Sequence, residues 1–125
     1  MDNPAPGFTA HPDHTISISP HVGTLDVVVD GTVIATTKHA LVLEEASYPP
    51  VIYLPFGAFD DALLMDSDKQ TWCPFKGHAS YYHLVVNGQT FENAIWYYET
   101  PFDEVEAIKG HVAVYPQIAK ASPRA

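Results

Sequence analysis

The sequence predicts a small domain made mainly of antiparallel β-strands. Two turn dipeptides, Asp30-Gly31 and Asn87-Gly88, each separate two runs of β-branched and aromatic residues. An Asn-Gly or Asp-Gly pair in this setting is the strongest short-range signal for a β-hairpin. Turn signals recur at short intervals, and 11 prolines suit exposed edges and corners. This spacing favours hairpins over alternating strand and helix units.

The predicted strands share a high content of β-branched or aromatic residues. In chain order they are residues 25–29, 32–35, 39–44, 51–54, 81–86, 89–91, 93–99 and 111–115. Two short helices accompany them. The first is expected at residues 58–65. The second should follow Thr100 and Pro101 and end at Gly110, because a Thr cap, a proline at the first helical position and a closing glycine are typical helix signals.

Composition indicates a single domain spanning residues 1–125. Hydrophobic residues make up 46% of the chain, and 2 Trp, 7 Tyr and 6 Phe are available to fill a core. Residues 1–12 and 119–125 lack periodicity and are rich in proline or in small and polar residues. We therefore expect both terminal segments to be loosely held.

The net charge and the cysteine content exclude some classes of function and partner. Fifteen acidic residues against six basic ones give a formal net charge of −9, which repels phosphate backbones and anionic lipid surfaces. No nucleic-acid or membrane partner is therefore expected. Cys73 is the only cysteine, so no intramolecular disulfide forms, and the first ten residues lack the pattern of a secretory signal. These features predict a cytoplasmic protein.

Residues 71–82 form the segment richest in reactive groups. Cys73 is a candidate nucleophile if a nearby cation lowers the pKa of its thiol, and the alternative is a small buried side chain beside a proline. Lys76 is a candidate cation for a carboxylate or phosphate, and the alternative is an ordinary solvated charge. Glu44 and Glu45 are also candidate site residues, because one of them could pair with Lys76 or act as a base.

Residues 91–99 form the second informative segment. On a regular strand Asn93, Tyr97 and Glu99 share one face, and Trp96 and Tyr98 share the other with Ala94. The first face predicts hydrogen-bonding groups beside aromatic walls, as in a small-ligand site, or else an ordinary half-exposed strand. The aromatic face predicts that Trp96 and Tyr98 anchor the core.

The seven histidines do not form a recognisable metal signature. His78 and His83 would face opposite sides of one strand, and a single cysteine cannot supply a structural zinc site. His11 and His14 lie in the N-terminal segment, where solvated side chains are expected. We predict no metal and no cofactor.

Two ordered motifs are similar to those of one bacterial family. A Cys-Pro-aromatic-Lys-Gly sequence followed by Ala-Ser-Tyr is matched within residues 73–81, and a Glu-Asn-Ala-aliphatic-Trp-any-Tyr-Glu run is matched at residues 92–99. Further segments that read like its members are residues 3–8, 11–14, 45–51 and 110–115. The chain thereby resembles domain of unknown function 427, also labelled nucleotidyltransferase-like, over most of its length.

The resemblance implies a small antiparallel β fold of the Mss4-like or methionine sulfoxide reductase B-like kind. Relatives with that fold often hold zinc with two Cys-x-x-Cys pairs, and here Lys76 stands where a second cysteine would be. His39 replaces a common Arg, Phe56 begins a stretch that replaces charged residues, and Trp72 replaces a common His. These departures imply altered or lost activity if the family site uses those groups. The family implies no established reaction.

Two functions follow from these observations. The first is a small-molecule domain, binding or catalytic, in which Lys76 holds an anionic group and Cys73 or Glu99 supplies nucleophile or proton chemistry. Its remaining pocket residues are Glu45, Tyr81, Asn93 and Trp96. The second is a noncatalytic interaction module or homodimer, formed through an aromatic surface of Tyr48, Tyr53, Phe56 and Trp72. Nucleotide transfer ranks third, because neither a Gly-rich phosphate loop nor a pair of metal-binding carboxylates is found.

Overall fold

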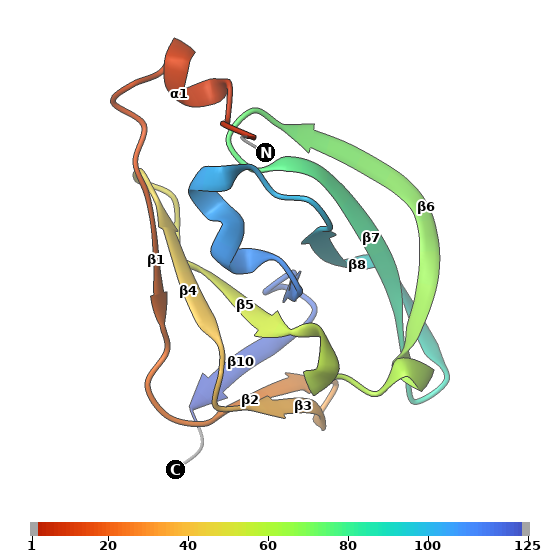
Figure 1. Cartoon of the computed structure of the whole chain (residues 1–125). Helices are drawn as coiled ribbons and strands as arrows, with labels where there is room; N and C mark the ends of the chain where they lie inside the picture. The colour runs from red at the N-terminus through yellow and green to blue at the C-terminus, as the bar shows by residue number, and fades with distance from the viewer. Residues whose placement is uncertain (1–2, 124–125) are drawn as a thin grey trace.

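Two antiparallel β-sheets make up the body of the protein (Figure 1). The structure is a computed structural model, and it describes residues 3–123. The larger sheet has the strand order β1-β4-β5-β9-β8-β7-β6, and the smaller has the order β10-β2-β3. The strands are β1 (Ile16–Pro20), β2 (Leu25–Val29), β3 (Thr32–Thr37), β4 (Leu41–Glu45), β5 (Val51–Pro55), β6 (Leu64–Cys73), β7 (Gly77–Val86), β8 (Gln89–Tyr98), β9 (His111–Val114) and β10 (Lys120–Pro123). The predicted fold class is therefore confirmed.

The helical segments are short. They are the α-helix α1 (Gly7–Ala10) and the 3₁₀ segments η1 (Phe56–Ala58), η2 (Asp61–Leu63) and η3 (Asp103–Ile108). Among residues 3–123, no helix has the length and apolar character that a membrane crossing needs.

The two faces of the larger sheet bury two separate clusters. Successive residues of β5 point to opposite faces, so Leu54 joins one cluster and Tyr53 the other. The first cluster packs the larger sheet against the smaller one. The second packs it against η3, whose Val105 and Ile108 are fully buried. Figure 1 shows η3, in blue, between the β1–β4 side and the β7–β8 side of the sheet.

Both predicted hairpins are present. Asp30-Gly31 joins β2 to β3 and Asn87-Gly88 joins β7 to β8, and all four turn residues have positive φ. The second predicted helix is η3. The first, at residues 58–65, was wrong in extent, because within that range only Ala58, at the end of η1, and residues 61–63 are helical, and Leu64 begins β6.

Three strands lie outside the predicted set: β1, β6 and β10. The longest of them, β6, is an edge strand that pairs only with β7, and most of its side chains are exposed. An edge strand of this kind carries little apolar alternation for a sequence pattern to reveal.

Both terminal segments that were expected to be loosely held make long-range contacts within residues 3–123. The backbone N–H of Asn3 donates to Asp103 Oδ2 at 2.7 Å, and that of Ala5 donates to Glu104 Oε1 at 2.8 Å. At the other end, β10 pairs with β2, and Ala119 is buried. Long-range hydrogen bonds thus hold segments whose local sequence carries no periodic signal. Residues 1–2 and 124–125 lie outside the described residues.

Ile108→Ala should lower the free energy of unfolding by about 2–5 kcal/mol, because it truncates a fully buried side chain beneath the larger sheet. Chemical denaturation measures the change. Val22→Ala is the control, since Val22 is 92% exposed and should unfold like the wild type. If the Ile108→Ala protein were as stable as that control, η3 would not be part of the stabilising core.

Candidate functional site

The β6–β7 turn presents Phe75 and Lys76 to the N-terminal segment and to η3. Cys73 and Gly77 are partners across the turn. Gly77 has φ +119°, and a Cβ there would lie 3.4 Å from the Thr100 carbonyl oxygen. Only glycine adopts this conformation readily. The carbonyl of Lys76 accepts a hydrogen bond from the Phe102 N–H, which fixes the turn against the start of η3.

The Phe75 ring is the contact point of the N-terminal segment. A Cβ on Gly7 would lie 2.7 Å from this ring, so the close approach of α1 requires glycine. Phe8 meets the ring edge-on at a centroid distance of 5.0 Å, and His14 stacks on it at 3.8 Å with an interplanar angle of 12°. The Gly7 N–H also donates to the Pro74 carbonyl at 2.9 Å. These contacts fix the orientation of the His14 imidazole.

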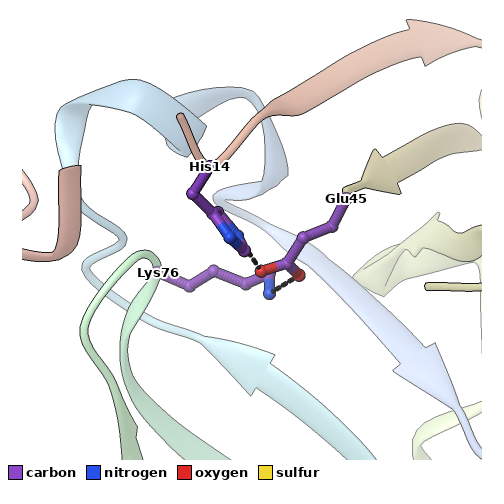
Figure 2. A network of polar contacts seen from close by, with 3 residues as sticks. All are labelled: His14, Glu45 and Lys76. Carbon is purple, nitrogen blue, oxygen red and sulfur yellow. Dashed lines mark hydrogen bonds and ion pairs between the residues drawn. The ribbon is translucent and has the colours of Figure 1, made fainter. Parts of the chain in front are cut away.

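Glu45 binds both Lys76 and His14 (Figure 2). Its Oε1 accepts from Lys76 Nζ, and its Oε2 faces His14 Nε2 at 2.7 Å. The three side chains come from the segment before β1, the end of β4 and the β6–β7 turn. Since an ionised carboxylate can only accept, His14 Nε2 carries the hydrogen of this contact.

The network keeps Glu45 ionised. Burial by itself raises the pKa of this carboxyl, but the hydrogen bonds and charges of Lys76 and His14 outweigh burial, and the net pKa is lowered. Lys76 is the one buried charged side chain among residues 3–123. Each partner therefore compensates the desolvation of the other.

Two buried tyrosines lie beneath this network. Burial raises the pKa of Tyr53; the indole of Trp96 acts in the opposite direction, and the charge of Glu45 adds to the increase. Burial likewise raises the pKa of Tyr98, with smaller effects from Tyr53 and Cys73. Both hydroxyls stay protonated at neutral pH, so they add hydrogen-bond donors but no charge.

A cavity of about 910 Å³ opens beside the network. Its walls come from the β4–β5 turn, the β6–β7 turn, β5, β8, β9 and the C-terminal segment. Its polar lining residues are His14, Glu45, Tyr48, Cys73, Lys120 and Ser122. Its apolar lining residues are Val27, Pro49, Pro50, Val51, Ile52, Leu54, Pro74, Phe75, Trp96, Val114, Pro116, Ala119 and Ala121.

Some of the site residues predicted from the sequence line this cavity, and others lie elsewhere. Cys73, Glu45 and Trp96 line it, whereas Lys76 lies behind Glu45 and reaches the site through that carboxylate. Tyr81 does not line it, because its hydroxyl is bonded to Thr71 Oγ1 at 2.9 Å and its ring is buried in the second core cluster.

Asn93 and Glu99 do not share a site with Lys76, which corrects the predicted grouping. Asn93 lies at an irregularity in the β7–β8 pairing with φ +51°, its side chain bonded to Ser67 and its N–H to His83. Glu99 is exposed and borders a different depression. The irregularity also breaks the predicted alternation, since Ala94 joins the same cluster as its neighbour Ile95.

Trp96 and Tyr98 do share a face, in agreement with the sequence. Both belong to the cluster that packs against η3, and Tyr98 is buried. Trp96 is half-buried, with its ring centroid 4.5 Å from that of Tyr115.

Sequence reasoning missed His14 and Phe75. His14 was expected to be solvated, yet it is stacked on Phe75 and bonded to Glu45. The available signal was the set of motifs at residues 3–8 and 11–14, which read like family members although the segment has no periodicity. Among residues 3–123, no three His, Cys, Asp or Glu side chains gather in a group that could hold a metal ion.

The fold and site define a mainly β protein with a cavity beside a partly buried Lys–Glu–His network. Residues 17–122 match the family described as a domain of unknown function, DUF427. The chain belongs to this family, as its motifs predicted. His14 lies just before the matched residues. No curated protein matches the sequence. The Mss4-like assignment of the fold stays a prediction.

Glu45→Gln should lower the melting temperature at pH 7 and make the melting temperature less sensitive to acid. Because the folded-state pKa of Glu45 is lowered from 4.5, its stabilisation is present above pH 4.5 and is lost as the pH falls through the folded pKa. Thermal denaturation between pH 7 and pH 3 measures both effects.

Glu44→Gln is the control, since Glu44 is its exposed neighbour on β4. Identical acid sensitivity in the wild type and Glu45→Gln would show that the network does not stabilise the folded state.

Proposed function

We propose that the protein binds a small, mainly apolar molecule with one anionic group in the cavity beside Glu45. The observation that carries this proposal is the cavity itself, about 910 Å³ with mostly apolar walls and a few polar groups. Small-molecule sites span about 300–1,000 Å³ and have this composition.

The apolar walls are held in place by the fold. Trp96 packs on Tyr115 and meets Tyr53 edge-on at a centroid distance of 6.5 Å. Phe75 is fixed by α1 and His14. A ligand would meet rings that are already ordered, so binding would cost little conformational entropy.

The anionic group is assigned to Lys120 and His14 rather than to Lys76. The charge of Lys76 is compensated by Glu45, and Lys76 does not line the cavity. Lys120 lines the cavity and is exposed, so its amine can move toward a ligand carboxylate or phosphate. His14, also a lining residue, adds a positive charge when protonated.

Cys73 and His14 are the residues a reaction in this cavity would use. Cys73 lines it at the end of β6, and His14 has the carboxylate-bound geometry of a general base. In this arrangement Lys76 is a positioning residue that fixes Glu45. The candidate catalytic role of Glu99 is not part of the proposal, because Glu99 does not line this cavity.

Self-association is the second candidate, favoured by large apolar side chains at the surface. Tyr48 is 67% exposed and Trp72 is 54% exposed. Tyr53 was wrongly assigned to this surface, since it is buried in the core. Sedimentation over a range of concentrations tests this candidate, and dimer formation that Trp72→Ser abolishes would support it.

The apolar anion 8-anilinonaphthalene-1-sulfonate should bind the native protein, with a fluorescence increase that saturates. Ala121→Trp should weaken this binding about tenfold or more, because Ala121 lines the cavity and is exposed, so an indole there fills the site without disturbing the core. Ala107→Trp is the matched control, since Ala107 is exposed on η3 and outside the cavity.

Lys120→Gln should weaken binding about threefold, the size expected for one exposed charge. Lys109→Gln is its control, as an exposed lysine outside the cavity. Equal affinity of the wild type and Ala121→Trp for the probe would contradict the proposed site.

A further inference from the structure

A second depression, of about 310 Å³, is walled largely by aromatic rings. Its lining residues are Phe56, Tyr82, Tyr97, Glu99, Gly110, His111 and Val112. None of these residues lines the larger cavity. The depression lies where η1, β7, β8 and the start of β9 meet.

Its aromatic rings form a fixed corner. Tyr82 and Tyr97 stack at a centroid distance of 4.9 Å and an interplanar angle of 16°. The Phe56 ring packs against Tyr82 at a centroid distance of 5.8 Å and an interplanar angle of 50°. Its face is therefore tilted relative to the stacked pair. Phe56 is 37% exposed, so part of the corner is open to solvent.

Carboxylates lie near this corner, and its titratable lining residue His111 contacts the Lys109 carbonyl through Nδ1. Glu99 is an exposed lining residue. Burial raises the pKa of the Tyr82 hydroxyl, as do a hydrogen bond with Tyr97 and the charges of Asp66 and Glu99. Both carboxylates are thus close enough to act on Tyr82. The net charge of −9 adds a long-range attraction for cations.

Aromatic faces beside a carboxylate recognise a particular kind of ligand. The face of an aromatic ring is electron-rich and attracts cations that are too weakly hydrated to prefer water, above all quaternary ammonium groups. A carboxylate at the rim adds Coulomb attraction without needing a hydrogen-bond donor on the ligand. Apolar ligands would gain from the rings but not from Glu99.

We propose that the corner formed by Phe56, Tyr82 and Tyr97, with Glu99 at its rim, binds a quaternary or methylated ammonium group. Both a free small molecule and a methylated lysine side chain carry this chemistry. No residue lines both this corner and the larger cavity, so the proposal does not rest on the proposed function.

Isothermal titration with choline tests the proposal, with 3,3-dimethyl-1-butanol as its uncharged analogue of the same shape. Choline should bind with a dissociation constant of about 1 mM, and the uncharged analogue about tenfold more weakly. A second titration uses Nα-acetyl-Nε-trimethyllysine amide. Tighter binding of this probe than of choline would identify a modified protein side chain as the source of the ammonium group.

Two variants with matched controls locate the site. Glu99→Gln should weaken choline binding about threefold to tenfold, whereas Glu92→Gln, exposed on the same strand, should not change it. Phe56→Leu should weaken it about fivefold, whereas Trp72→Leu, an exposed aromatic outside the depression, should not. All four positions are at least partly exposed, so the variants should fold.

Several results would overturn the proposal. One is equal affinity for choline and its uncharged analogue, which would remove the role of charge. Another is an absence of choline binding at about 50 mM, well above the expected dissociation constant. A third is choline binding that survives both Glu99→Gln and Phe56→Leu, which would place the ammonium group elsewhere.

Discussion

The carboxylate of Glu45 is the point on which the arrangement of the site depends. It bonds to His14 and Lys76, which lie 31 residues before and 31 residues after it in the chain. Through these bonds the end of β4 is joined to the N-terminal segment and to the β6–β7 turn. The same turn is bonded to α1 through Pro74 and to the start of η3 through Lys76. One side chain thus fixes the relative positions of the segments that form one side of the large cavity.

The physical constraint is the burial of charge. Lys76 is one of the least exposed polar residues in the described chain, and a buried ammonium without a partner would be strongly destabilising. Glu45 supplies the compensating charge, and His14 uses its second oxygen. The Phe75 ring then covers His14 on one face. Because both oxygens of Glu45 are bonded and His14 is stacked on Phe75, this part of the cavity wall is held by contacts within the chain.

The sequence predicts the hairpins well because their turns are local. Asp30-Gly31 and Asn87-Gly88 specify the backbone at the turn itself, whatever the rest of the chain does. Edge strand β6 escapes prediction because its exposed polar side chains carry no apolar pattern. The N-terminal segment escapes it because its order comes from partners far away in the chain, such as Asp103, Glu104 and Phe75.

In the candidate site, too, the sequence predicted some features, whereas others depend on contacts between distant parts of the chain. Residue chemistry suggested that either Glu44 or Glu45 could pair with Lys76, and in the structure Glu45 does so. It also suggested that Lys76 and Glu99 share a pocket, because the Asn87-Gly88 hairpin makes the strands that carry Tyr81 and Trp96 neighbours. The two strands do pair, but Glu99 borders a different depression, and the positive φ of Asn93 interrupts the regular strand that was to place Asn93 beside it. His14 needed knowledge of tertiary contacts that its neighbours do not encode.

The most direct test of this account is a double-mutant cycle on Lys76→Met and Glu45→Gln, with free energies of unfolding from chemical denaturation at pH 7. Each single variant leaves a buried group without its charged partner, whereas the double variant removes both charges. The account predicts that the double variant loses at least about 1 kcal/mol less than the sum of the single losses. Losses that add to within about 0.5 kcal/mol would contradict it, because they would show that the two side chains do not stabilise each other.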